Sequence, residues 1–550
     1  MNLFKARLTK ANIQNIVVAL CFFAICVATQ QMQTVAWNTG IIDFSRDILG
    51  VVMALILMTH YKWNDIIKHK IPYIIWSVLG IIFGIIFVPM SIEERGEYLA
   101  ADTVIISIGI FLMGYCLIYT GINIFVNKYR PKFYLPLFVI WIVMLILMIF
   151  SDSDYLWPEC YFVLFLSLYL TEQTSEQRTN VIKGMVNGII LAFVAIQAHA
   201  LLCRPYDRVR YYGNFCNPNQ NATFLCICLS AILAKIIFLT RDNERKIVRT
   251  FYFLMAGVCY SFICMTASRS GYLSVFVVTI FFLLAYCKVT ERKVFIKMGA
   301  LLVLLFVALM PMTYLAVRYI PTIHPHVLFY FQEGYSEERV HSWDDRNSPK
   351  YISFTQLMKT VLGRFGSLIP QQVDLSEEQA TDVELASQEI ESANIDLSDV
   401  VLSEDEINAD IPETDPDKIP ALSTEEAKSP FRVRYTIYKW YFTHLSLRGM
   451  PYDEQGFQLT EDHWIQDTHD IYLDYGINFG YPVMILFIVF IWWGIGRLAK
   501  YGLRAKSAEK LSCLLIALVP PIFGLFEFAW GAGMISTVAL YFTFKEMFSN

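Results

Sequence analysis

Apolar residues occur along most of the chain in uninterrupted runs of about 20 rather than at the spacing of an amphipathic helix. A run of this length crosses a hydrocarbon core of about 30 Å, and its backbone amides must be paired within the segment, which favours helices. Fourteen such runs cover residues 13–34, 45–60, 71–90, 103–125, 133–150, 155–170, 182–202, 222–239, 250–267, 271–287, 298–316, 478–496, 511–526 and 528–545. The pattern predicts an all-α, polytopic transmembrane helix bundle of about 12–14 spans.

Lysine and arginine alternate between the loops that join these runs. Basic residues gather at 5–10, 62–70, 128–132, 178–183, 241–249, 288–297 and 497–510, whereas turns such as 91–102 and 151–154 are acidic or neutral. Short cytoplasmic loops carry the excess of Lys and Arg, so both termini are expected to be cytoplasmic. The chain is therefore expected to be a multi-pass protein embedded in the lipid bilayer.

Residues 317–473 form a long segment expected on the outer side, between transmembrane parts at 1–316 and 474–550. The stretch 371–430 holds 18 Asp and Glu against two Lys, with no aromatic residue. Such a stretch cannot bury enough apolar surface to fold alone, so residues 371–428 are expected to be a disordered acidic insertion. The flanks at 351–369 and 431–447 are expected to lie as short helices against the membrane face.

Composition changes this picture in two ways. The formal net charge is -5, but outside residues 371–430 the chain holds 42 Lys and Arg against 31 Asp and Glu, so the membrane body is basic. The 12 cysteines lie mostly in apolar runs, without CxxC pairs or metal-ligand spacing, which indicates packing. Cys203 and Cys216 flank a polar outer loop, where they either pair as a disulfide or stay free.

Three arginines occupy an outer loop, where arginine should be scarce. Arg204, Arg208 and Arg210 precede the sequence Gly-Asn-Phe-Cys-Asn-Pro-Asn, which ends at Asn219. Such guanidinium groups either snorkel to lipid headgroups or clamp phosphate oxygens in bidentate fashion.

A second exception to the charge rule is the short outer turn that contains Ser268 and Arg269. A helix begins at this turn, and its dipole favours an anion near Arg269. The alternative is a helix start capped by Ser268, with Arg269 snorkelling to the headgroups.

His469 is the histidine held closest to a membrane-facing helix start, just before the twelfth run. Histidine titrates near neutral pH and can act as a general base, with Asp470 or another carboxylate orienting the ring. The alternative is a structural role for this histidine.

Several enzyme classes lack their motifs in this sequence. No phosphate-binding loop, dinucleotide fingerprint, HExxH pair or G-x-S-x-G elbow occurs in a fitting context, which argues against ATPases, dinucleotide enzymes, zinc proteases and lipases. Few charges lie within the apolar runs, Glu159 and Glu527 being exceptions, so a proton-coupled transporter is not favoured.

Taken in order, the motifs resemble those of the O-antigen ligase and polymerase family, multi-span glycosyltransferases of bacterial envelopes. Residues 210–219 resemble the family's arginine loop ending in Gly-x-Phe-x-Asn-Pro-Asn, and residues 268–271 resemble its Ser-Arg-Gly turn. Residues 432–449 resemble the helix before its Leu-x-Gly-x-Gly turn, and residues 469–473 its His-Asn-x-Tyr-Leu motif. The likeness covers residues 200–545. It departs at Asp470, where the family has Asn, and at the acidic insertion.

The resemblance implies a metal-independent transferase without a cofactor, in the bacterial cytoplasmic membrane, with an undecaprenyl-diphosphate-linked glycan as donor. The acceptor would be a glycan, a lipid or a protein hydroxyl, and no nucleic acid is expected as a partner. His469 would be the general base, and Arg210 and Arg269 would stabilise the leaving diphosphate as the anomeric centre inverts. The expected substrate-binding residues are Arg204, Arg208, Asn219, Ser268, Arg434 and Asp470.

Two readings from other classes stay open. A flippase or transporter of polyisoprenoid-linked glycans would also have many spans, although the long outer segment and the outer arginines fit it less well. An envelope scaffold would use the acidic loop to bind a partner. Within the family, the sequence does not separate polymerase from ligase.

Overall fold

A computed structural model of the chain describes residues 10–28, 41–95, 100–155, 157–203, 210–215, 217–320, 353–366, 430–460, 463–465, 468–525 and 534–549. Arg204, Arg208, Cys216 and the acidic insertion at 371–428 lie outside the described residues, so both alternatives for Cys203 and Cys216 stay open and the expected disorder stays a prediction.

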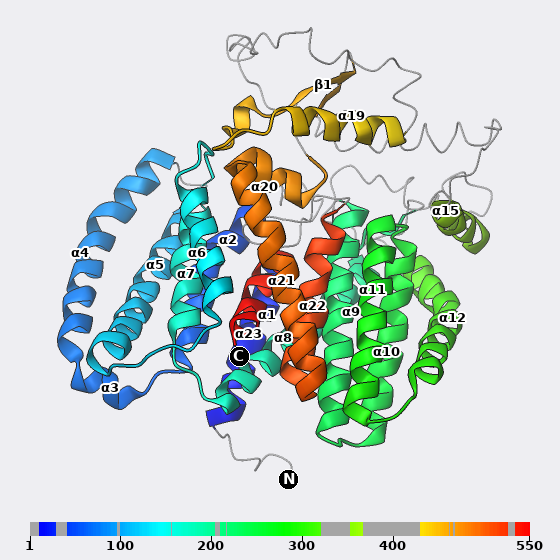
Figure 1. Ribbon diagram of the computed structural model, residues 1–550, viewed down its shortest axis with the longest axis horizontal. Helices are drawn as coiled ribbons and strands as arrows, with labels where there is room; N and C mark the ends of the chain where they lie inside the picture. Colours follow the sequence, from blue (N-terminus) through cyan, green and yellow to red (C-terminus); the bar gives the residue numbers. More distant parts are fainter. Residues whose placement is uncertain are drawn as a thin grey trace.

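Helices dominate the described ranges, and fourteen of them coincide with the fourteen expected runs (Figure 1). They are α1 (Lys10–Ala28), α2 (Ile41–Met58), α4 (Lys70–Arg95), α5 (Ala100–Gly121), α6 (Leu135–Ile149), α7 (Trp157–Leu170), α8 (Ser175–Cys203), α9 (Pro218–Arg241), α10 (Lys246–Met265), α11 (Arg269–Thr290), α12 (Phe295–Tyr319), α21 (Tyr481–Ala505), α22 (Ala508–Phe523) and α23 (Ile535–Phe548). A short helix, α3 (Trp63–Lys68), lies between α2 and α4, and a π-helical turn, η3 (Ile122–Val126), continues α5.

Eight helices of the described part are long and apolar enough to cross a membrane. They are Lys70–Met90, Thr103–Val126, Ser175–Leu202, Pro218–Arg241, Lys246–Met265, Arg269–Thr290, Phe295–Tyr319 and Tyr481–Ala505. Four apolar helices are shorter, at Asn12–Ala28, Ile48–Met58, Leu135–Ile149 and Trp157–Leu170. The expected all-α polytopic class is consistent with these eight candidate spans, and the count of 12–14 spans stays a prediction.

The centre of the bundle is formed by helices that protein surrounds on all sides. Every residue of α22 except Glu509 is buried, and 94% of the apolar window of α9 is buried. A helix enclosed in this way need not match the thickness of lipid, which accounts for the 16 residues of α22. By contrast, α4 lies at the edge beside α5 in Figure 1, with only 6% of its window buried.

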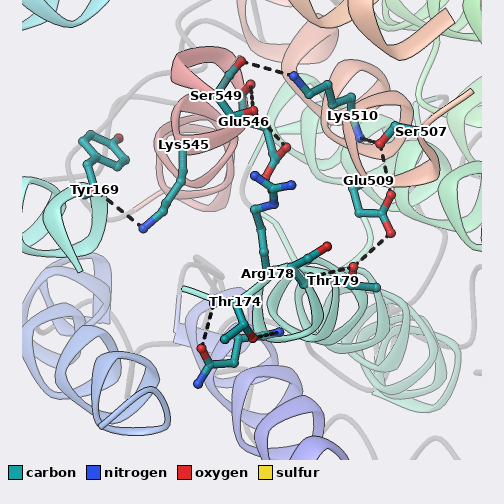
Figure 2. A network of polar contacts seen from close by, with 12 residues as sticks. Tyr169, Thr174, Arg178, Thr179, Ser507, Glu509, Lys510, Lys545, Glu546 and Ser549 are labelled. Atoms are coloured by element: carbon teal, nitrogen blue, oxygen red, sulfur yellow. Dashed lines mark hydrogen bonds and ion pairs between the residues drawn. The ribbon is translucent and has the colours of Figure 1, made fainter. Parts of the chain in front are cut away.

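The basic loops come together at one end of the bundle, where ion pairs join helices distant in sequence (Figure 2). Arg178 of α8 lies 3.1 Å from Glu546 of α23, and Arg241 of α9 lies 2.5 Å from Glu509 of α22. Lys183 pairs with Asp242 at 2.8 Å, Lys62 with Glu172 at 3.2 Å, and Lys506 with Glu291. We call this the basic end. The residues of the basic end belong to the loops expected to be cytoplasmic. The side of the membrane that this end faces stays a prediction.

A layer of shorter elements covers the opposite end (Figure 1). It contains α15 (Phe354–Gly366), α19 (Pro430–Thr443), the 3-10 turn η6 (Tyr452–Glu454), the strands β1 (Phe457–Thr460) and β2 (His463–Ile465), and α20 (Ile471–Phe479). The helices α15 and α19 match the expected flanks at 351–369 and 431–447. The antiparallel hairpin pairs Phe457 with Ile465 and was not expected.

The covering layer is anchored through buried apolar contacts. Leu357 and Val361 of α15 are buried in the main core, and the Phe354 ring lies 5.2 Å from that of Tyr314 in α12. A second core holds Ile437, Trp440 and Tyr441 of α19, Phe457 and Leu459 of β1, and Leu473 and Ile477 of α20. The hairpin is therefore explained by packing, since Phe457 and Leu459 point inward while Gln458 is exposed.

Two glycines allow the turn after α19 to press on the junction between α20 and α21. Gly449 and Gly480 have φ of +80° and +95°, a region that side chains disfavour. A Cβ at Gly449 would meet the backbone carbonyl of Asn478, and one at Gly480 would meet that of Leu447. This junction ends α20 and separates it from α21, whereas the sequence placed one span start at residue 478.

Candidate functional site

The side chain of Arg210 joins the first two motifs. Its Nε donates to the carbonyl of Thr266 at 2.9 Å, and its Nη2 donates to Asn219 Oδ1 at 2.5 Å. The neighbouring backbone N–H of Tyr211 donates to the carbonyl of Met265 at 2.9 Å. The arginine loop is thus fixed both to the first turn of α9 and to the turn between α10 and α11. A planar guanidinium bonded to two protein acceptors is held in a defined orientation.

The turn itself is a capped helix start. Ser268 accepts a hydrogen bond on Oγ from Gly271 N–H at 3.3 Å and is only 1% exposed, so its side chain caps α11. The capping contact is present, and substrate binding by Ser268 stays a prediction. Arg269 is exposed in the first turn of α11, where the positive end of the helix dipole favours anions.

His469 lies at the tip of a tight turn, with φ of +51°. Thr468 Oγ1 donates to the carbonyl of Asp470 at 2.8 Å and accepts from its N–H at 3.2 Å, which fixes the backbone on both sides of the histidine. The ring is half-buried, and within the described residues it makes no hydrogen bond. Its nitrogens are therefore available to receive a proton from a ligand.

Asp470 has a different role from the one expected. Its Oδ1 accepts from the backbone N–H groups of Tyr472 at 2.8 Å and Leu473 at 3.0 Å, which caps α20. Burial raises the pKa of Asp470 to about 6, against the effect of the two N–H donors, which favour the charged carboxylate. No hydrogen bond joins this carboxylate to His469 in the described part of the chain, so the expectation that it orients the histidine is corrected.

A short path of contacts connects His469 with the arginine motifs. Ile471 N–H donates to the carbonyl of Gly524 at the end of α22, at 2.7 Å. The preceding Phe523 packs with Ala222 in the first part of α9, and a Cβ added to Gly271 would lie 3.3 Å from Ala222. The first residues of α9, α11 and α20 and the last of α22 therefore share one end of the bundle. Convergence of Arg210, Arg269 and His469 on one cavity stays a prediction.

Two arginines at this end were not singled out from the sequence. Arg364 of α15 lies close enough to Tyr272 of α11 for its charge to act on the tyrosine hydroxyl, as does that of Arg210. Arg318, in the last turn of α12, is only 2% exposed. The signal that could have found both is the one used for Arg210, namely arginine in a part of the chain expected on the outer side, where arginine should be scarce.

The remaining expected residue, Arg434, is half-buried on α19, in the layer that covers α20. Asn219 is placed as a positioning residue, because its side-chain oxygen accepts from Arg210. Among the described residues, no group of three or more His, Cys, Asp or Glu side chains could hold a metal ion.

Comparison with known proteins identifies no relative of this chain. No protein-family model, no curated protein and no solved structure matches it.

Proposed function

We propose that this protein transfers a glycan from an undecaprenyl-diphosphate-linked donor to an acceptor hydroxyl at the outer face of a bacterial cytoplasmic membrane. It would act as a polymerase or ligase of O-antigen or capsular type. The observation that carries the proposal is the position of Arg210, whose guanidinium is held by Thr266 and Asn219. Two motifs expected to bind one diphosphate thereby form a single unit with Arg269 at its exposed edge.

In the proposed reaction, an acceptor oxygen attacks the anomeric carbon of the donor from the face opposite the diphosphate. The new carbon–oxygen bond forms as the bond to the diphosphate oxygen breaks, and that oxygen keeps the electron pair. Negative charge grows on the diphosphate, so arginines fixed before the reaction stabilise the transition state more than the bound donor. His469 takes the acceptor proton.

His469 is suited to this role by its turn. The hydrogen bonds of Thr468 to the backbone of Asp470 hold the histidine at a defined point, and the cap of α20 keeps that point next to the end of α22. The ring would be oriented by the substrate, or by a residue outside the described ranges, rather than by Asp470.

Proteoliposomes with isotope-labelled lipid-linked donor test the proposal. We expect label to become covalently attached to a second glycan, lipid or protein acceptor. Movement of the donor across the bilayer without a new glycosidic bond would show a transporter and refute the proposal.

Substitution of His469 by Ala should leave donor binding nearly unchanged and lower turnover by about 10²- to 10⁴-fold, the contribution of a general base. His444 is the matched control, because it lies in the same covering layer, with its ring stacked on Trp440 at 4.0 Å. His444→Ala should keep turnover. Equal loss in both variants would point to damage of the layer rather than loss of a base.

A further inference from the structure

A cavity of about 260 Å³ lies at the basic end, away from the candidate site. It opens between the loop at 129–133, the end of α7, the start of α8 and the end of α23. Four basic side chains line it, Arg130, Lys132, Arg178 and Lys545, and no Asp or Glu belongs to its described wall. We call it the basic pocket.

Two of the four basic side chains, Lys545 and Arg178, are bonded to other groups of the protein. Figure 2 shows Lys545 reaching toward the end of α7, where its Nζ donates to the carbonyls of Leu168 at 2.7 Å and Thr171 at 2.9 Å. Arg178 extends from α8 toward Glu546 at 3.1 Å, and this carboxylate compensates one of the charges. These two side chains are fixed in position, as the walls of a binding site should be.

The other two cations are not compensated. Arg130 and Lys132 are exposed, and neither has an ion pair or hydrogen bond with any described residue. Like charges placed around one cavity repel each other, and an anion between them removes that repulsion. The pocket is therefore complementary to an anion that brings more than one negative oxygen.

A buried donor points to the same ligand. The side-chain Nε2 of Gln173, on the pocket wall just before α8, is buried and has no hydrogen-bond partner within the described part. Burying an amide N–H without an acceptor is unfavourable, so such a donor is expected to have a partner when the site is filled. The nearby helix start does not supply the acceptor, because Thr174 and Gln177 bond to each other, Thr174 N–H to Gln177 Oε1 at 3.0 Å and Gln177 N–H to Thr174 Oγ1 at 3.2 Å.

We propose that the basic pocket binds a phosphate group, carried either by an anionic phospholipid headgroup or by a soluble phosphate. Arginine and lysine side chains are the usual partners of phosphate oxygens, and basic pockets between helices on the cytoplasmic side are suited to lipid headgroups. The volume is below the range of about 300–1,000 Å³ typical of pockets for drug-sized ligands, so it suits one headgroup and not a glycan. The site is independent of the proposed transferase activity, since it lies at the other end of the bundle.

Calorimetric titration of the purified, delipidated full chain tests the proposal. The probes are inorganic phosphate, short-chain phosphatidylglycerol and short-chain phosphatidylcholine. We expect phosphate or phosphatidylglycerol to bind and the neutral phosphatidylcholine to bind at least about ten-fold more weakly, since charge-assisted contacts dominate the site. Binding of phosphatidylglycerol without phosphate identifies a lipid ligand, and binding of phosphate identifies a soluble one.

The double variant Arg130→Gln/Lys132→Gln should lose about ten-fold in affinity for each cation removed. The matched control is Arg292→Gln/Lys293→Gln, because these residues are exposed at the same end, outside the pocket, and their loss changes the net charge equally. The control should bind like the unaltered protein. Equal losses in both variants, equal binding of all three probes, or no binding of phosphate or phosphatidylglycerol would overturn the proposal.

Discussion

Asp470 offers a sharp test of the local structure around His469, because capping of α20 favours its charged carboxylate whereas burial disfavours it. It caps α20 through two backbone N–H groups, yet burial raises its pKa from 3.8 to about 6. Asparagine keeps an oxygen acceptor of the same shape and carries no charge to desolvate. We therefore expect Asp470→Asn to stabilise the protein at pH 7.5 and Asp470→Ala to destabilise it.

The magnitude follows from the shift. A rise of about 2 pKa units corresponds to about 3 kcal/mol disfavouring the charged form in the folded state, and partial exposure of the group reduces this to about 1–3 kcal/mol. Asparagine gives up about 0.3–1 kcal/mol of attraction between a carboxylate and the helix dipole. The expected gain for Asp470→Asn is thus about 1–2 kcal/mol, whereas loss of the cap in Asp470→Ala costs about 0.5–2 kcal/mol.

The sign of the pH dependence follows from the same shift. The folded state holds the proton of Asp470 more tightly than the unfolded state, so its contribution to stability is present below pH 3.8 and is lost as pH rises through about 6. Thermal unfolding of both proteins in detergent at pH 4.5 and 7.5 measures this. The advantage of Asp470→Asn should be larger at pH 7.5. An advantage that is larger at pH 4.5, or an Asn variant as unstable as the Ala variant, would refute the assignment.

Three further predictions concern the site and the topology. Arg210→Lys should recover only part of the turnover lost in Arg210→Ala, because one ammonium cannot reproduce the fork that bonds Thr266 and Asn219; full recovery would mean that charge alone matters. In a cysteine-free background, a membrane-impermeant reagent applied from outside should modify a cysteine at Lys439 and spare one at Asn243, and the reverse pattern would invert the topology. Deletion of residues 375–425 should leave transfer active, since loop closure depends only weakly on length; an inactive protein at normal membrane levels would contradict this.

The sequence predicted the elements whose signal is local. Runs of apolar residues located fourteen helices. Amphipathic spacing located α15, because Leu357 and Val361 lie four residues apart and are both buried on one face of the helix. The capping role of Ser268 was also among the alternatives, since serine before a helix start is a strong local signal.

Features that depend on contacts between distant segments were missed. The hairpin of β1 and β2 forms because Phe457 and Leu459 pack in a core with residues of α19 and α20. The sequence of the hairpin alone does not predict this packing. Asp470 was one candidate to orient His469 because the two are adjacent in sequence, but its carboxylate bonds to the first backbone N–H groups of α20. The basic pocket could not be predicted either, because its residues come from distant segments and each one resembles an ordinary Lys or Arg next to a membrane span.

The ion pairs of the basic end have a consequence for how the protein is made. Arg178 and Arg241 belong to α8 and α9, but their carboxylate partners, Glu546 and Glu509, lie in α23 and α22, which are synthesised more than 250 residues later. Until those helices are in place, the two arginines lack these partners and α9 lacks one of the helices that pack against it. These contacts of α8 and α9 therefore form only after residues 508–548 have been synthesised. A chain cut before residue 508 would leave Arg178 and Arg241 without these ion pairs.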